Sequence, residues 1–243
     1  MPLLAMLYRS NSTKMPDEAM QNYKHRLYEQ FARIGKALGN AHRLEIVDLL
    51  AQTDHSVDSL ARKTGMSIAS VSQHLQILRG AQLVAVRREG TYAYYRLADE
   101  NVLRVWLAIS QLAQVHLAEI DKLTRDFFKD RPALEAISAD ELLKRLEDVT
   151  LTLIDARPQD EYQAGHIPGA ISLPMEAFET GLDRLILENE IVVYCRSAYC
   201  LLSDEVALAL YQRGFAVRVL EEGMLEWQHS GFPIVKPGNE DAG

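Results

Sequence analysis

Both cysteines of the chain, Cys195 and Cys200, lie in one short segment. A β-branched strand over 192–194 leads into a polar loop that opens with Cys195, and an apolar-periodic helix follows through 206–210. Such a loop turns backbone N–H groups toward the sulfur, and with the positive helix start and Arg196 they favour thiolate over thiol. Cys195 is therefore a candidate nucleophile. The alternative is a pair of ordinary buried thiols, because free cysteine behaves as a small hydrophobe.

Cys200 offers this loop a second chemical step. Attack by its thiol on a persulfide or an oxidised form of Cys195 would close an intramolecular disulfide, and a reversible sensor requires such a resolving cysteine. Alternatively, Cys200 packs inward at the helix start and does not react. Cysteines this close together cannot join distant parts of a fold, so a structural disulfide framework is not expected.

The elements around this loop predict an α/β domain. Short β-branched runs at 151–154, 191–194 and 216–220 alternate with helical stretches, which is typical of a parallel sheet covered by helices. The motifs beside them are Asp155-Ala156-Arg157-Pro158, Glu161-Tyr162, Gly165-His166-Ile167-Pro168-Gly169-Ala170, Tyr194-Cys195-Arg196-Ser197, and Glu222-Gly223 with Trp227, Gly231, Phe232 and Pro233.

With these motifs, residues 137–235 closely resemble the rhodanese-like fold. The resemblance implies a five-stranded parallel sheet with helices on both faces and a loop cysteine that accepts a sulfane sulfur as a persulfide. Cys195 is then the acceptor, the backbone of 196–201 is its cradle, and Arg196 and Cys200 complete the expected catalytic loop. The remaining motif positions are expected to be structural: Asp155, Arg157, Glu161 and His166.

The loop departs from the common pattern of sulfurtransferases, which often carry a glycine in its middle and a second arginine at its end. Ala198 and Cys200 stand there instead. Loss of that arginine weakens attraction for a dianion such as thiosulfate, so a persulfide or polysulfide is the favoured donor. The residue six positions after Cys195 is Leu201 rather than arginine, which argues against a phosphatase or arsenate reductase loop.

The first half of the chain predicts a mainly α domain with a β-hairpin. Helical patterns cover 17–38, 42–51, 57–63 and 67–79, and two strands at 83–88 and 92–97 flank Glu89-Gly90-Thr91. A 4-3 apolar spacing then runs from Val102 through His116 to Phe127, which indicates one long helix that needs a partner. This order of elements is that of a winged helix-turn-helix domain.

The helix at 67–79 is the expected DNA reader, and Ser67 is its expected N-cap. One face is an apolar stripe predicted to be buried: Ile68, Val71, Leu75 and Leu78. The opposite face and its flanks present side chains that suit a major groove: Ala69, Ser70, Ser72, Gln73, His74, Gln76 and Ile77. The hairpin adds Arg87, Arg88 and Tyr92, which we expect to touch the DNA backbone or the minor groove.

The runs at 44–50, 60–61, 70–78 and 90–97 resemble the ArsR family of winged-helix repressors, most specifically in Ser70-Val71-Ser72-Gln73-His74-Leu75. The resemblance implies a homodimer in which the first and last helices of the domain form the subunit interface. The dimer is expected to bind double-stranded operator DNA as a twofold-related site. Many members sense metals, yet 44–50 holds no cysteine. His116 and Glu119 resemble half of a metal site, but Leu103 and Val105 occupy the other half and cannot ligate. We therefore expect that the protein binds no metal and that His116 packs in the dimer core.

Charge separates the two halves. Residues 1–133 hold 18 Lys and Arg against 14 Asp and Glu, whereas residues 134–243 hold 8 against 20. A polyanion such as DNA suits the first half alone. The expected organisation is a flexible arm (1–16), a winged helix-turn-helix domain for dimerisation and DNA binding (17–128), a linker (129–136), a rhodanese-like domain (137–236) and a tail (237–243). No segment suits a membrane span or a secretory signal, so we expect a cytoplasmic protein without membrane contact.

These expectations combine into a dimeric transcriptional regulator, expected to repress, whose rhodanese-like domain senses sulfane sulfur or oxidants through Cys195. Its small-molecule partner would be a persulfide, polysulfide or thiosulfate, and no cofactor is expected. One alternative is a sulfurtransferase, active at Cys195, that is tethered to a DNA-binding domain. Another is a metal-responsive repressor with an inactive rhodanese-like domain.

Overall fold

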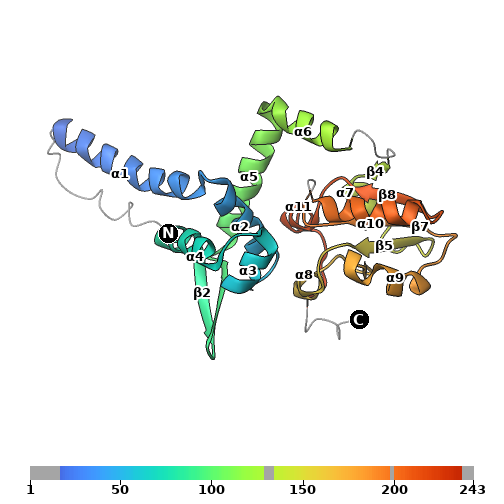
Figure 1. Cartoon of the computed structure of the whole chain (residues 1–243). Coiled ribbons are helices and arrows are strands. Elements are labelled where there is room, and N and C mark those ends of the chain that lie inside the picture. The colour runs from blue at the N-terminus through green and yellow to red at the C-terminus, as the bar shows by residue number, and fades with distance from the viewer. Residues whose placement is uncertain (1–16, 129–133, 198–199, 237–243) are drawn as a thin grey trace.

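The computed structural model describes residues 17–128, 134–197 and 200–236. The predicted arm (1–16) and tail (237–243), and most of the predicted linker (129–136), lie outside the described residues. Figure 1 shows a helical domain with a projecting β-hairpin and a second domain built on a β-sheet, with α6 (Ala118–Phe128) leading from one toward the other. The winged helix and the α/β domain predicted from the sequence are both present.

The first domain follows the predicted order of elements. Its helices and strands are α1 (Asp17–Leu38), α2 (Ala41–Gln52), β1 (His55–Ser56), α3 (Val57–Thr64), α4 (Ile68–Gly80), β2 (Val84–Glu89), β3 (Tyr92–Leu97), α5 (Glu100–His116) and α6. Strands β2 and β3 form an antiparallel hairpin in which Glu89 lies opposite Tyr92. The short strand β1, which the sequence did not indicate, pairs with β3.

Apolar spacing explains how these helices pack. Val71, Leu75 and Leu78 are fully buried on one face of α4, together with Leu60 of α3. Ile68 was also predicted to be buried and is 55% exposed. It is the first residue of α4 and precedes the turns that enter the core. The Ser67 side chain accepts a hydrogen bond from the Ser70 amide, which confirms the predicted N-cap.

The predicted continuous helix over 102–127 is wrong, because the chain bends at Leu117. The backbone of Leu117 is extended, so α5 ends at His116 and α6 starts at Ala118. The bend turns two parts of the apolar seam toward a shared hollow of about 360 Å³. Ile109 and Ala113 line that hollow from α5, and Ile120 and Leu123 line it from α6.

The second domain, within its described residues, contains a five-stranded parallel sheet in the order β4-β8-β7-β5-β6. Its elements are β4 (Glu135–Ile137), α7 (Ala139–Lys144), β5 (Leu151–Asp155), α8 (Gln159–Ala164), β6 (Ile171–Ser172), the 3-10 helix η2 (Met175–Ala177), α9 (Phe178–Gly181), the 3-10 helix η3 (Leu182–Arg184), β7 (Glu190–Tyr194), α10 (Leu201–Tyr211), β8 (Ala216–Leu220) and α11 (Met224–His229). Strand β4 begins inside the segment predicted as linker.

The central strand β7 alternates its side chains between two apolar layers. Ile191 and Val193 pack with Val206 of α10, whereas Val192 and Tyr194 pack with Trp227 of α11 on the other side. Helices on both faces bury Ile191, Val192, Val193 and Tyr194, which explains the apolar run in this strand. The strand therefore delivers the residue after it, Cys195, to the carboxyl edge of the sheet.

Candidate functional site

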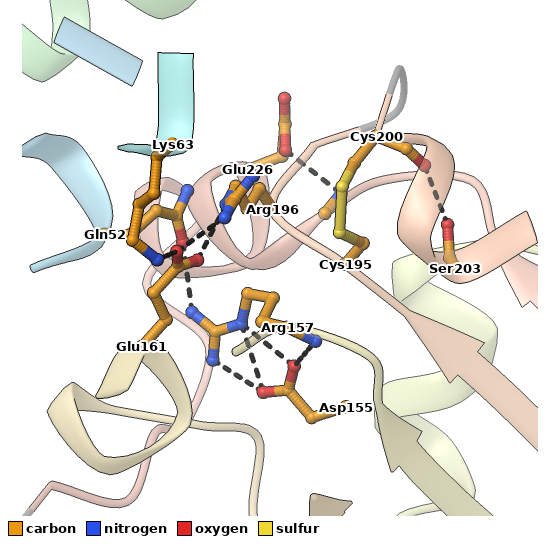
Figure 2. The surroundings of a disulfide bond; sticks show 11 residues. Gln52, Lys63, Asp155, Arg157, Glu161, Cys195, Arg196, Cys200, Ser203 and Glu226 are labelled. Atoms are coloured by element: carbon orange, nitrogen blue, oxygen red, sulfur yellow. Dashed lines mark hydrogen bonds and ion pairs between the residues drawn. A yellow bond between two sulfur atoms is a disulfide. The ribbon is translucent and has the colours of Figure 1, made fainter. Parts of the chain in front are cut away.

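Cys195 and Cys200 form a disulfide across the loop between β7 and α10 (Figure 2). Cys195 is only 1% exposed, and Cys200 is partly buried. In the disulfide form, Cys195 is therefore shielded from solvent. The two sulfur atoms are nevertheless within bonding reach, which is the geometry that a resolving cysteine needs.

Backbone contacts with α11 hold the start of the loop. The Met224 amide donates to the Cys195 carbonyl over 2.8 Å, and the Leu225 amide donates to the Arg196 carbonyl over 3.2 Å. A Cβ atom at Gly223 would lie 2.2 Å from the nitrogen of Ser197, so a glycine is needed for this close approach. The position of the loop thus depends on the first turn of α11.

The predicted backbone cradle, 196–201, is described only in part. Ala198 and Tyr199 lie outside the described residues. The Cys200 amide donates to the Ser197 carbonyl over 3.1 Å. That N–H group is therefore engaged within the loop.

Arg196 directs its guanidinium to a carboxylate. Nε lies 2.7 Å from Oε2 of Glu161 and Nη2 lies 2.6 Å from Oε1, a two-point ion pair with a fully buried acid. Burial acts to lower the pKa of Arg196, but the hydrogen bond and charge of Glu161 outweigh it and the pKa is raised. The positive charge that was expected to stabilise a thiolate is thus paired with Glu161.

The motif residues expected to be structural form buried polar contacts. Arg157 donates to both carboxylate oxygens of Asp155 and to the Gly165 carbonyl, at distances of 2.6–3.1 Å. The imidazole of His166 stacks on Tyr162 with ring centroids 3.9 Å apart. Asp155, Arg157 and Glu161 are at most 1% exposed.

Two of these residues also reach the first domain. Nη1 of Arg157 donates to Oε1 of Gln52, the last residue of α2, over 3.0 Å. Nζ of Lys63 in α3 lies 3.1 Å from Oε1 of Glu161 and 3.5 Å from the carboxylate of Asp160. The sequence analysis missed Gln52 and Lys63, because a contact between domains leaves no periodic signal in either one.

The predicted DNA-reading face of α4 has the required exposure. Gln73 is exposed, and Ser70, Ser72 and His74 are half-buried at its edges. The His74 ring lies beside that of His42 with centroids 5.6 Å apart and the planes tilted by 43°, and its buried Nδ1 has no hydrogen-bond partner among the described residues. Burial, then the charge of Arg43, lowers the pKa of His74.

The hairpin places its three predicted residues differently. Arg88 and Tyr92 are exposed, the latter by 62%. Arg87 is also exposed but pairs with Glu89 over 2.7 Å, and its Nε lies 3.6 Å from Asp54. A contact between Arg87 and a phosphate would therefore have to compete with two carboxylates.

Comparison with known proteins decides the family. Residues 40–86 match the family described as bacterial regulatory protein, arsR family, and residues 138–230 match the rhodanese-like domain. The HTH-type transcriptional regulator Rv0324 of Mycobacterium tuberculosis is 43% identical over 208 residues, which cover 86% of this chain and 91% of that protein. The chain belongs to the ArsR family of DNA-binding transcriptional regulators. This regulator carries a rhodanese-like domain after its winged helix.

Two further relatives each resemble part of the regulator. A sulfurtransferase of Allochromatium vinosum is 33% identical over 103 residues, which cover 42% of this chain and 94% of that protein. The solution structure of the homodimeric winged helix-turn-helix DNA-binding domain (fragment 1–100) of Mb0332 from Mycobacterium bovis is 43% identical. That match covers 43% of the regulator and 93% of the other chain, with a TM-score of 0.39.

The described residues of the regulator contain no group of three or more His, Cys, Asp or Glu side chains placed to hold a metal ion. His116, which was expected to pack in a dimer core, is exposed in the single chain. Among the described helices none is long and apolar enough to cross a membrane.

Proposed function

We propose that this regulator senses sulfane sulfur or oxidants through Cys195 and Cys200, and that the resulting disulfide changes its affinity for operator DNA. The observation that carries the proposal is the pairing of both cysteines in one loop at the edge of the sheet. Because the sequence has no further cysteine, a two-electron signal stored in thiols can be held only at this pair.

The chemistry needs no reagent other than the donor. The Cys195 thiolate attacks the outer sulfur of a persulfide RSSH, the S–S bond of the donor breaks, and RSH leaves with the proton. The Cys200 thiolate then attacks the inner sulfur of the Cys195 persulfide and displaces hydrogen sulfide. The products are the Cys195–Cys200 disulfide, RSH and H₂S, so atoms and electrons balance.

We also propose that the regulator binds DNA as a homodimer. Exposed apolar side chains gather on the first helix and around the bend at Leu117, where a second copy would cover them. They are Met20, Tyr23, Leu27, Tyr28 and Phe31 of α1, and Leu112, Val115, Leu117, Leu123 and Phe127 of the α5–α6 region. Ser70, Ser72, Gln73, His74, Arg87, Arg88 and Tyr92 remain our proposed DNA contacts.

A DNA-binding titration tests the sensing function. A duplex selected by the reduced protein is titrated with wild type, Cys195→Ser and Cys200→Ser, each with and without glutathione persulfide, and the intact masses are recorded. We expect wild type to lose the mass of two hydrogens and to change affinity, Cys200→Ser to gain one sulfur, and Cys195→Ser not to respond. A hundredfold change corresponds to about 2.7 kcal/mol.

The likeness to a sulfurtransferase favours one competing function, catalytic sulfur transfer. Rapid turnover of thiosulfate or persulfide, with DNA affinity indifferent to Cys195→Ser, would overturn the sensor and leave an enzyme tethered to a DNA-binding domain. An affinity that changes with the disulfide while turnover stays slow would support the sensor.

A further inference from the structure

One buried carboxylate joins the cysteine loop to the helix-turn-helix. The Glu161 side chain is fully buried, and it receives Arg196 from the loop on one side and Lys63 from α3 on the other. Figure 2 shows these three side chains meeting, with the disulfide beyond Arg196. Lys63 and Arg196 are themselves largely covered, with side chains 19% and 17% exposed.

On the loop side, Arg196 lies inside the ring that the disulfide closes. The bond between Cys195 and Cys200 restricts the backbone torsions between them, and opening it restores that freedom. In this disulfide form the Arg196 carbonyl accepts a hydrogen bond from the Leu225 amide, and the backbone so placed carries the Arg196 side chain to Glu161. A change in the state of the cysteines therefore acts on the residue that pairs with Glu161.

On the DNA-binding side, Lys63 stands on the helix that supports α4. Leu60, one turn before Lys63, is fully buried in the same core as Val71, Leu75 and Leu78 of α4. A packed core transmits displacement because it has few voids to absorb it. Movement of α3 relative to the second domain therefore moves the helix that faces DNA.

The electrostatics make the three groups interdependent. Burial acts to raise the pKa of Glu161, but the hydrogen bond and charge of Arg196, followed by Lys63, outweigh it and the pKa is lowered. If a buried carboxylate loses one of its two cations, it must form a stronger ion pair with the remaining cation or become hydrated. The charge of Arg196 also acts on Asp48 of α2. Burial raises the pKa of Asp48, and the hydrogen bond from Trp106 and the charge of Arg196 oppose this rise.

We propose that the Lys63–Glu161–Arg196 cluster couples the thiol–disulfide state of Cys195 and Cys200 to the placement of the helix-turn-helix. Its consequence for DNA affinity rests on the proposed function above. The coupling itself is a separate claim, because linkage is reciprocal: if the cysteines act on α3 through Lys63, then Lys63 acts on the stability of the disulfide.

The test compares Lys63→Gln with wild type in two measurements. In the first, glutathione redox buffers give the equilibrium constant of the cysteine pair by thiol alkylation and mass spectrometry. We expect Lys63→Gln to shift this constant by about fivefold or more, the lower end of typical coupling between sites. Lys63→Arg keeps the charge and should restore the wild-type value, and Lys144→Gln, an exposed lysine of α7, is the matched control. An unchanged constant in Lys63→Gln would overturn the coupling.

The second measurement gives the DNA dissociation constant of the disulfide form and that of the form reduced with dithiothreitol, and the ratio of the two is compared. Lys63→Gln should move this ratio toward 1 by a similar factor, and use of a ratio cancels any direct contribution of the lysine to DNA binding. A wild-type ratio of 1 would refute the proposed function while the redox measurement still decides the coupling. Where the wild-type ratio differs from 1, a shifted redox constant with an unshifted ratio would show that the cluster does not reach the helix-turn-helix and would overturn the proposal.

Discussion

Gly223 is the residue that allows the cysteine loop to lie against α11. A Cβ there would come 2.2 Å from the nitrogen of Ser197 and 2.4 Å from the carbonyl carbon of Arg196. Both neighbours are backbone atoms, which cannot rotate away as the end of a long side chain can. The contact therefore fixes the loop without any contribution from a side chain at position 223.

Gly223→Ala should displace the loop and weaken the domain. We expect a loss of about 1–3 kcal/mol in the free energy of unfolding, as for other overpacked sites, and faster alkylation of Cys195 in the reduced protein. Chemical denaturation and timed alkylation measure the two effects. Gly80→Ala is the control, because a Cβ at Gly80 meets no atom within 4 Å. Equal stability and equal reactivity of the two variants would refute the close contact.

His55 gives a prediction for pH dependence. It is 1% exposed, Nδ1 lies 3.1 Å from Oγ of Ser59, and Nε2 has no hydrogen-bond partner within the described parts of the chain. Burial, followed by the charge of Lys63, lowers the pKa of His55, while the carboxylates of Asp160 and Glu161 oppose the shift. The folded protein thus binds this proton at lower pH than the unfolded chain does.

As pH falls below the ordinary histidine pKa of about 6.5, the unfolded chain takes up the proton first and the folded state loses stability. The loss ends once pH is below the lowered pKa of the folded state. We expect the unfolding free energy of wild type to fall more steeply than that of His55→Asn between about pH 7 and about pH 5.5. Denaturant titrations at a series of pH values measure it, and parallel profiles would contradict the prediction.

At the scale of elements, local pattern determined most of what could be predicted. Three- and four-residue steps of apolar side chains predicted α4, because one face of that helix is buried. A continuous β-branched run predicted β7, because both faces of that strand are buried. The bend at Leu117 could not be predicted, since neither glycine nor proline marks it. Strand β1 has only two residues and no period.

The residues of the candidate site show the same limit of local pattern. Cys195 and Cys200 were found from sequence because a single loop carries both. Gln52 and Lys63 were not found, because their partners Arg157 and Glu161 are about a hundred residues away along the chain. Only the packing of one domain on the other brings these groups together, and no local pattern encodes it.

The exposed face of α4 predicts a specific loss of DNA binding. Gln73→Ala should weaken binding to the selected duplex by about 1–3 kcal/mol, the range for one bidentate base contact, with little effect on unrelated DNA. Gln212→Ala, an exposed glutamine at the end of α10, is the matched control. Competition titrations with both duplexes measure the difference, and equal weakening on both would assign Gln73 to the DNA backbone.

At the scale of the whole molecule, the amino-terminal part of α1 projects away from the rest of the chain (Figure 1), while Ala37 and Leu38 at its carboxyl end are buried in the core of the first domain. Its outer face carries the apolar side chains assigned above to the dimer. A helix in a protein owes most of its stability to the packing of an apolar face, and most of α1 is exposed in the single chain. We therefore expect α1 to be stable only in the assembled dimer.

Phe31→Glu should separate the subunits. Phe31 is 58% exposed in the single chain, and Ile186 of the second domain, 56% exposed, gives a matched control as Ile186→Glu. Analytical ultracentrifugation should find wild type and the control as dimers and Phe31→Glu as a monomer, with DNA affinity reduced by about tenfold or more. A dimeric Phe31→Glu would exclude α1 from the interface.

The hydrogen bond from Arg157 to Gln52 limits which substitutions the two domains can accept during evolution. Arg157 donates hydrogen bonds inside the second domain, to the Gly165 carbonyl among others, and it also donates one to Gln52, the last residue of α2. Another rhodanese-like domain joined to this winged helix would have to place its own arginine and glutamate against Gln52 and Lys63 in the same way. The two modules are thus not interchangeable parts, and substitutions on either side must be accommodated by the other.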